Sequence, residues 1–185
     1  MRLYNRLFLW ITVALSTSIA LAAPPKVGDP APDFTLPFAS QDTINFDGVT
    51  LSDYHGEYPV VLAFYPADWS PGCTTQMCNF RDNFSAFNAI DAEIFGISGD
   101  YVFSHKAWID SMGFQFKLLS DHQHKVAQMY ESYRPKLGMN KRTVFVVAPD
   151  GTISYIDMEY SPGDPADFDA LQQHLSSLNE PVEMK

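Results

Sequence analysis

The sequence predicts a single α/β domain in which strands alternate with helices around a sheet that is covered on both faces. The chain has 185 residues, of which 46% are hydrophobic, enough to bury one core. Short β-branched runs alternate with segments of helical periodicity, and a strand–turn–strand unit followed by a helix closes the chain. No internal repeat or Gly/Ser-rich linker is visible, so we treat residues 23–185 as one domain.

Residues 1–22 have the features of a secretory signal peptide. Arg2 and Arg6 precede an apolar run from Leu7 to Ala23, and Ala20 and Ala22 are small residues at the −3 and −1 positions of a cleavage site. A Pro-Pro pair, which disfavours a continuing helix, follows at once. We therefore expect cleavage after export and a periplasmic or secreted protein. The alternative is a retained membrane anchor, because the apolar run approaches the length that spans a bilayer.

The charge balance argues against nucleic acid as a partner. The chain has 22 acidic and 12 basic residues and a formal net charge of −10. A surface that binds phosphates needs an excess of Lys and Arg, and an acidic protein is repelled by an anionic membrane. We expect no nucleic acid partner and, once the signal peptide is removed, no membrane association.

Apolar patterns predict four elements in the first half of the domain. The β-branched and aromatic run over 60–65 predicts a buried central strand. From residue 73, apolar side chains recur at intervals of four, three, four and three, which predicts one helix over 73–90. We expect the next strand over 93–98 and the next helix over 103–112.

The second half is predicted in the same way. We expect a short strand over 116–119 and a helix over 124–133 that stops before Pro135. Strands over 143–148 and 152–157, joined by a Pro-Asp-Gly turn, predict a hairpin. A closing helix over 165–178 has Asp164 as its N-cap.

The two cysteines, Cys73 and Cys78, would by default form a structural disulfide in an exported protein. Cys73, however, opens a predicted helix, where unpaired backbone N–H groups and the helix dipole favour a thiolate. In an intact helix, residues five apart are offset by about 140° and their Cα atoms lie about 8–9 Å apart. A disulfide tolerates about 7 Å at most. The bond therefore requires the helix to unwind, which favours a catalytic pair.

The segment around Cys73, FYPADWSPGCTTQMCNFRD, resembles a known family. Pro66, Ser70 and Cys73 match the peroxiredoxin signature Pro-x-x-x-Thr/Ser-x-x-Cys, and the wider run is similar to the bacterioferritin comigratory protein or peroxiredoxin Q branch. The resemblance begins at residues 28–34, which are similar to that family's N-terminal hairpin, and continues to Arg142-Thr143. It implies a thioredoxin-like fold with a central mixed sheet, flanking helices and an N-terminal hairpin.

The resemblance also implies roles for individual residues. Cys73 would be the peroxidatic cysteine and Cys78 the resolving one. Pro66 would shield the reactive sulfur, while Ser70 and Arg142 would hydrogen-bond the peroxide.

Two positions depart from the family pattern. Ser70 stands where Thr is usual, so the hydroxyl is kept but the methyl group that fixes its rotamer is lost. Gln76 stands where the branch commonly has Glu, which removes a carboxylate–arginine pairing. How Arg142 and Arg81 are held is therefore left open by the sequence.

The implied activity is a thiol-dependent peroxidase for hydrogen peroxide and organic hydroperoxides. It would pass through a Cys73 sulfenic acid and a Cys73–Cys78 disulfide that an external dithiol, thioredoxin-like or other, reduces. No metal, haem, flavin or nucleotide cofactor is implied. By analogy with the branch, we expect a monomer or weak homodimer.

Two alternative functions belong to other classes. An exported thiol–disulfide oxidoreductase usually carries Cys-x-x-Cys and a proline before the facing strand, whereas here four residues separate the cysteines and Arg142-Thr143 precede the strand. A thioredoxin-like copper-handling protein would need His105 or His122 as a third ligand, and it would leave Ser70 and Arg142 unexplained.

Overall fold

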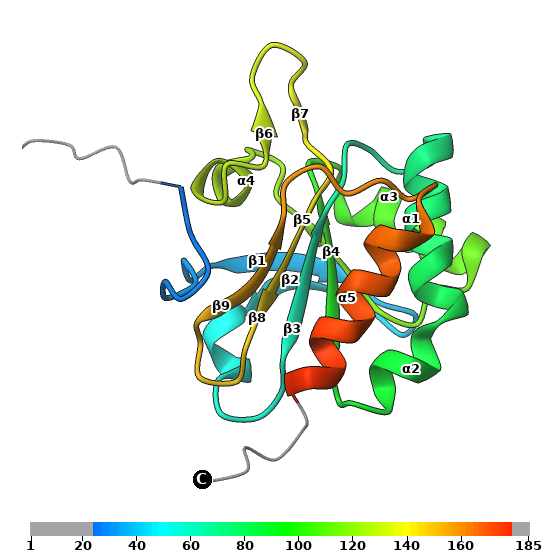
Figure 1. Ribbon diagram of the computed structural model, residues 1–185. Helices are drawn as coiled ribbons and strands as arrows, with labels where there is room; N and C mark the ends of the chain where they lie inside the picture. The colour runs from blue at the N-terminus through cyan, green and yellow to red at the C-terminus, as the bar shows by residue number, and fades with distance from the viewer. Residues whose placement is uncertain (1–23, 179–185) are drawn as a thin grey trace, which may run out of the picture.

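The computed structural model describes residues 24–178, and its centre is a seven-stranded mixed sheet (Figure 1). The strand order is β2-β1-β5-β4-β3-β8-β9. Strands β3, β4 and β5 are parallel to one another, and the remaining pairs are antiparallel, as expected for a central mixed sheet. The strands are β1 (Thr35–Ala39), β2 (Ile44–Thr50), β3 (Val60–Phe64), β4 (Glu93–Ser98), β5 (Lys117–Ser120), β8 (Thr143–Val147) and β9 (Ile153–Asp157).

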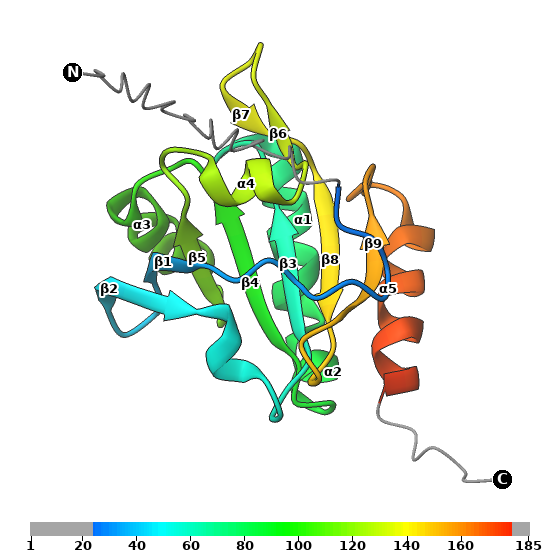
Figure 2. The same cartoon turned by 90° about the vertical axis from the view of Figure 1, so that its left-hand side faces the viewer.

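Helices cover both faces of this sheet, which confirms the predicted layers (Figures 1 and 2). Among the described residues, four α-helices cover one face, and a 3₁₀ turn and a short α-helix cover the other. A small two-stranded ribbon projects beyond the sheet above α4. The elements are α1 (Pro71–Asp82), α2 (Phe84–Asn88), α3 (Val102–Met112) and α5 (Pro165–Leu178) on the first face, η1 (Leu51–Tyr54) and α4 (Lys125–Met129) on the second, and the ribbon strands β6 (Tyr133–Arg134) and β7 (Met139–Asn140).

The central strand β3 lies between two cores because its side chains alternate between the two faces. Val61 and Ala63 join the core beneath α1 and α5, whereas Val60, Leu62 and Phe64 join the core beneath α4. All five side chains are buried. This two-sided burial explains why the strand is a continuous apolar run and has no polar alternation.

The predicted single helix over 73–90 is wrong in its second half. The α-helix ends at Asp82, and Asn83 adopts a non-helical conformation (φ −107°, ψ 13°) before α2 begins. The Asn83 side-chain amide donates to the Asn79 carbonyl at 2.9 Å. Asparagine competes for backbone hydrogen bonds in this way, which explains the break.

The helix predicted over 124–133 is also too long, because α4 spans residues 125–129 alone. Glu131 has a left-handed backbone (φ 52°), a conformation that no α-helix continues through. Tyr133 and Arg134 then pair with β7. The apolar periodicity in this stretch reflects packing of Val126, Ala127 and Tyr130 against the sheet.

Both ends of the domain are as expected in outline. Strands β8 and β9 form the predicted hairpin, and Asp164 accepts a hydrogen bond from the Ala166 backbone N–H at 3.0 Å, as an N-cap residue does. The N-terminal hairpin consists of β1 and β2. Residues 28–34 lie just before it, where Pro30 forms an isolated bridge with Thr152.

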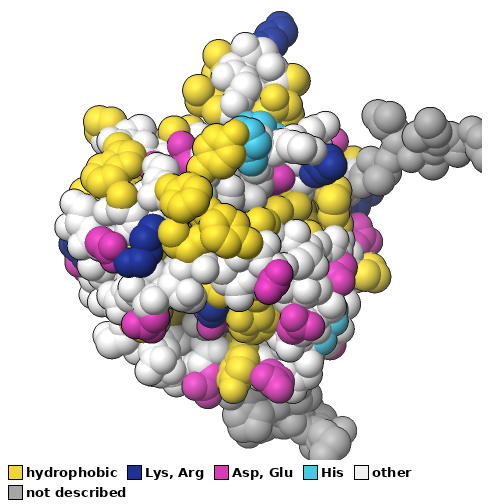
Figure 3. All heavy atoms as spheres, turned by 180° about the vertical axis from the view of Figure 1, so that it is seen from behind, with side chains coloured by type: hydrophobic (Ala, Val, Ile, Leu, Met, Phe, Trp, Pro, Cys, Tyr) yellow, Lys and Arg dark blue, Asp and Glu magenta, His cyan; other side chains and the backbone are white. Residues whose placement is uncertain are grey.

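Several aromatic side chains are exposed on the surface. Phe46 and Phe103, which are 64% and 65% exposed, lie with their ring centroids 5.9 Å apart, and Tyr101 stacks on His122. Figure 3 shows hydrophobic side chains gathered beside a histidine on one face of the molecule. Between residues 24 and 178, no helix has the length and hydropathy to cross a membrane. The predicted signal peptide lies outside the described residues.

Candidate functional site

Cys73 lies in the first turn of α1, as the sequence predicts. Ser70 occupies the N-cap position with an extended backbone (φ −71°, ψ 143°), and Pro71 takes the first helical position, where its missing N–H costs nothing. Cys73 is therefore the third helical residue, next to backbone N–H groups that have no partner within the helix. Its side chain is fully buried, which shields it from bulky reagents.

Arg142 reaches Cys73 because of the register between two antiparallel strands. Phe64, the last residue of β3, pairs with Thr143, the first residue of β8. The residue before Thr143 therefore lies beside the connection that leads from β3 to α1. Arg142 Nη2 is 3.5 Å from Cys73 Sγ. A Cβ atom on Gly72 would come within 3.1 Å of the same nitrogen, so glycine gives the guanidinium its space.

Gln76 holds Arg142 in place. Its side-chain oxygen accepts a short hydrogen bond from Arg142 Nη1, and the residue is completely buried. The amide oxygen thus contacts the guanidinium at the position where the family pattern has a carboxylate. The Gln76 Nε2 group is buried without a hydrogen-bond partner among the residues that the structure describes, so one donor remains available close to the guanidinium.

The other predicted site residues are placed less closely. Pro66 begins the connection between β3 and α1. The Ser70 hydroxyl does not cap the helix; instead its carbonyl accepts from the Thr74 backbone N–H at 2.8 Å. Cys78 lies farther along α1 and is half-buried, and both cysteines are free thiols. Arg81 contacts Asp82 and the Met112 carbonyl and interacts electrostatically with Cys78, not with Cys73.

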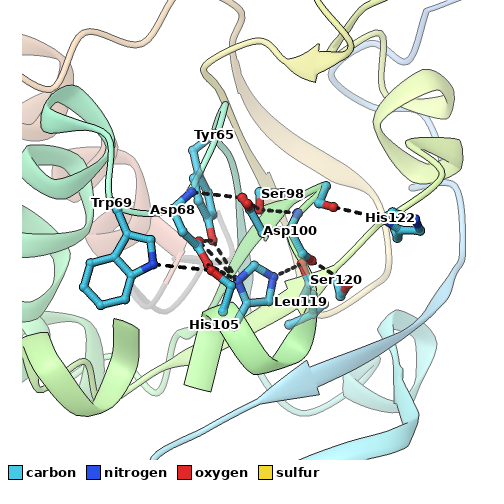
Figure 4. Close-up of polar contacts among 11 residues, drawn as sticks. Tyr65, Asp68, Trp69, Ser98, Asp100, His105, Leu119, Ser120 and His122 are labelled. Carbon is cyan, nitrogen blue, oxygen red and sulfur yellow. Dashed lines mark hydrogen bonds and ion pairs between the residues drawn. The ribbon is translucent and has the colours of Figure 1, made fainter. Parts of the chain in front are cut away.

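The sequence did not identify a buried polar network beside this site (Figure 4). The Asp68 carboxylate, in the connection that follows β3, accepts hydrogen bonds from Tyr65 and Ser104 and pairs with His105. Burial, followed by the charge of Asp68, raises the pKa of Tyr65 well above its usual value, so this phenol stays protonated and donates. These four residues come from two separate segments, and no spacing in the sequence connects them.

Arg142 also lines an open surface hollow of about 550 Å³. Tyr160 is part of its wall, and burial raises the pKa of this phenol while Arg142 opposes part of the rise. The hollow gives the guanidinium an approach from solvent. Its other walls include Arg134, Lys141, Met158, Glu159, Ser161 and Pro162.

No group of three or more His, Cys, Asp or Glu side chains within residues 24–178 is arranged to hold a metal ion. His105, one of the two candidate ligands in the copper alternative, contacts Asp68 and the Leu119 carbonyl through its two ring nitrogens. His122 bonds the Tyr101 hydroxyl. Both histidines thus have partners other than the cysteines.

Comparison with known proteins gives consistent results. Residues 27–156 match the model of the AhpC/TSA family. Peroxiredoxin Bcp of Bacillus subtilis is 35% identical over 134 residues, which cover 69% of this chain and 82% of that protein. Chloroplastic peroxiredoxin Q of Triticum aestivum is 40% identical over 144 residues, covering 77% and 63% of the two chains. The solved structure of peroxidoxin BcpB from Mycobacterium tuberculosis superposes with a TM-score of 0.72 at 34% identity, covering 84% of this chain and 99% of that one.

Proposed function

The chain belongs to the AhpC/TSA family and is a thiol-dependent peroxidase with a thioredoxin-like fold, and we propose that Cys73 is the residue that reacts with the peroxide. The observation that carries this proposal is the position of its sulfur. It lies in the first turn of α1, 3.5 Å from the Arg142 guanidinium. A permanent positive charge and the helix N-terminus both stabilise a thiolate.

In the first stage, the Cys73 thiolate attacks the terminal oxygen of the hydroperoxide. An S–O bond forms as the O–O bond breaks, and the leaving oxygen takes up a proton and departs as water or an alcohol. The sulfur is oxidised by two electrons to sulfenic acid, and the peroxide is reduced by the same two electrons. Negative charge passes from sulfur to the leaving oxygen during this step.

The residues around the sulfur are suited to that movement of charge. The Arg142 guanidinium is already fixed by Gln76, so its donors need no rearrangement as charge develops, which is the arrangement that lowers a barrier most effectively. We assign Ser70 and the first-turn N–H groups of α1 as further donors to the peroxide. Pro66 would shield the sulfur from water.

In the second stage, Cys78 attacks the sulfenic acid, and water leaves as the disulfide forms. Both cysteines lie within the continuous helix α1 in the reduced protein. Since residues five apart in a helix are too distant to bond, α1 must open locally. An external dithiol, thioredoxin-like or other, then reduces the disulfide by exchange.

The test uses the two cysteine variants with hydrogen peroxide and a dithiol reductant. Cys73→Ser should abolish peroxide consumption. Cys78→Ser should complete one turnover and accumulate Cys73 as sulfenic or more highly oxidised acid, which intact mass spectrometry detects. Residual turnover in Cys73→Ser, or unchanged repeated turnover in Cys78→Ser, would contradict the respective assignment.

The activity of a thiol–disulfide oxidoreductase is not favoured. The four-residue spacing between the cysteines and the arginine before β8 both differ from that class, and the relatives are peroxiredoxins. A direct comparison of insulin reduction with peroxide reduction distinguishes the two activities.

We further propose that the protein is exported and cleaved after Ala22. The support is the sequence of residues 1–22, which has basic residues near its start, an apolar run in its middle and small residues just before the cleavage site. Expression of the full chain followed by intact mass analysis of the periplasmic or secreted fraction tests this. A mature protein that begins at Ala23 is expected, and a full-length protein in the membrane fraction would favour the anchor. For the oligomeric state we propose a monomer or weak homodimer, which sedimentation velocity would measure.

A further inference from the structure

A buried ion pair anchors the segment that leads into the Cys73 helix. The Asp68 and His105 side chains are 1% and 0% exposed, and His105 Nδ1 lies 2.9 Å from Asp68 Oδ2. Asp68 belongs to the connection between β3 and α1, whereas His105 lies on α3. Figure 4 shows the two side chains facing each other beside the ends of the parallel strands. Charges buried this deeply persist when they are paired and hydrogen-bonded.

The hydrogen-bond partners of His105 fix its protonation state. Nδ1 faces the Asp68 carboxylate, and Nε2 lies 3.2 Å from the Leu119 carbonyl oxygen. Both partners are acceptors, so each ring nitrogen must carry a hydrogen. The Asp68 carboxylate also accepts from the Tyr65 hydroxyl at 2.8 Å and the Ser104 hydroxyl at 2.7 Å, and such donors stabilise its ionised form. The ring of His105 thus faces an acceptor at each of its two nitrogens, and one of these acceptors is a buried carboxylate.

The backbone of the same residue is anchored as well. The Asp68 backbone N–H donates to Asp100 Oδ2 at 2.9 Å. Asp100 is itself held by the Ser98 hydroxyl at 2.8 Å and, through its carbonyl, by the Ser120 hydroxyl at 2.6 Å. Asp68 is thus fixed through its side chain to α3 and through its main chain to Asp100, which is bonded to the ends of β4 and β5. This leaves the connection one firm point of attachment two residues before the helix N-cap.

The residue that follows shows why an anchor is needed. Trp69 has a left-handed backbone (φ 63°), which is unfavourable for a bulky side chain. Its side chain is half-exposed, its ring packs against Trp108 with the centroids 6.2 Å apart, and its indole N–H reaches Ser104 at 3.4 Å. Ser70, the N-cap residue of the Cys73 helix, comes next. The left-handed backbone at Trp69 sets the position of Ser70. Contacts from neighbouring residues must therefore maintain this backbone conformation.

We propose that His105 is a positioning residue for the peroxidase reaction: as a buried imidazolium it holds Asp68, and through Asp68 it fixes the turn that places Pro66 and Ser70 around Cys73. The proposal rests on the function assigned to Cys73 above. His105 acts through Asp68 and not on the peroxide. A carboxylate alone at this depth would lack a counter-charge, and a neutral histidine would either leave the Leu119 carbonyl without its donor or turn an unprotonated nitrogen toward the Asp68 carboxylate.

The first test is made on the wild-type protein and does not depend on its activity. Long-range ¹H–¹⁵N spectra of the reduced wild-type protein at pH 7, with the His105 signals assigned by their absence in His105→Gln or by backbone connectivity, report whether each ring nitrogen carries a hydrogen. Two protonated nitrogens are expected. A neutral tautomer, with one unprotonated nitrogen, would overturn the ionic part of the proposal even if the enzyme is fully active.

The second test measures the rate constant for Cys73 oxidation by hydrogen peroxide, at a temperature where each variant is folded. Asp68→Asn and His105→Gln should each lower it about 10- to 100-fold, the effect of a small displacement of reacting groups. The two substitutions combined replace the ion pair by a neutral amide pair, and the rate should recover to about tenfold above the slower single variant. His174→Gln, at a histidine on α5 that contacts the Ser154 hydroxyl, is the matched control and should leave the rate unchanged.

A milder variant guards against misfolding. Tyr65→Phe removes one donor to Asp68 without changing the core volume and should lower the same rate about three- to tenfold. A residue with a purely structural role would lower the melting temperature but leave the rate of the folded protein at the wild-type value, and that result in Tyr65→Phe and the single variants would overturn the proposal. A wild-type protein without peroxidase activity would instead refute the proposed function, and the spectra would still decide the charge of His105.

Discussion

Arg142 Nη2 lies 3.5 Å from Cys73 Sγ although 69 positions separate the two residues in the chain. The pairing of β3 with β8 produces this contact, because it places the start of one strand beside the end of the other. Arg142 directly precedes strand β8 of the sheet, whereas Cys73 is part of helix α1. When α1 opens, we expect the Cys73 sulfur to move away from Arg142, while the guanidinium keeps its position.

Replacing Arg142 by lysine should slow Cys73 oxidation about 100- to 1000-fold, as loss of a preorganised donor does. An ammonium group cannot contact Gln76 and the sulfur with two separate donors in a fixed plane. Stopped-flow measurement of the rate with hydrogen peroxide tests this. Arg81→Lys is the matched control, since Arg81 contacts Asp82 and the Met112 carbonyl, and it should react at the wild-type rate.

Substitutions at Gln76 should separate its acceptor oxygen from its size. Gln76→Leu leaves Arg142 Nη1 without its partner, and loss of a hydrogen bond to a charged group, about 1.5–3 kcal/mol, should slow oxidation about 10- to 100-fold. Gln76→Glu keeps an acceptor for the guanidinium and should retain most of the activity. Equal rates in the two variants would show that the acceptor does not position Arg142.

Oxidation should increase amide exchange in the first turns of α1. The reduced protein has a continuous helix from Pro71 to Asp82, and a Cys73–Cys78 disulfide is incompatible with it. Hydrogen exchange read by mass spectrometry before and after one equivalent of peroxide measures the change. Helix α5 serves as an internal control and should exchange equally in both states. Equal protection of α1 in both states would contradict local opening.

Phe80→Ala should lower the free energy of unfolding by about 3–5 kcal/mol. Phe80 is fully buried on the inner face of α1, where its ring meets other aromatic rings. Phe103→Ala is the control, because Phe103 is 65% exposed, and its effect should stay within about 0.5 kcal/mol. Urea unfolding of the reduced proteins measures both. The rings in contact with Phe80 are those of Phe87, Phe116, Tyr160 and Phe168.

Acidification should destabilise the fold in part through His174. Burial lowers the pKa of this residue below its usual value of 6.5. As the pH falls through 6.5, the unfolded chain binds a proton that the folded protein does not, so the free energy of unfolding decreases. Urea unfolding at pH 7.5 and 5.5 should show a smaller decrease in His174→Gln than in the wild type. An unchanged difference between the two pH values would rule out His174 as a source.

Local patterns predicted most of the secondary structure, and they failed where tertiary contacts or side-chain hydrogen bonds decided. Periodicity located β3, β4, α3, β8, β9 and α5 because each buries a face that repeats along the chain. The helices that it predicted were too long at two places. One ends before Asn83, whose side chain bonds the backbone, and the other ends before Glu131, where the chain turns into the β6–β7 ribbon. Neither helix end changes the spacing of the apolar residues, so that spacing does not indicate where the helices stop.

The sequence by itself led to the proposal that Cys73 is the nucleophile and Cys78 its partner, since the motif around Cys73 and its spacing from Cys78 are local properties of one helix. It also singled out Arg142, by resemblance, without a physical reason for its proximity. The tertiary structure alone decided that Gln76 holds Arg142 and that Asp68 meets His105. The physical reason is that sheet pairing and the packing of α3 bring together segments that are distant in the chain. Interactions between residues close in sequence do not determine which of these segments will meet.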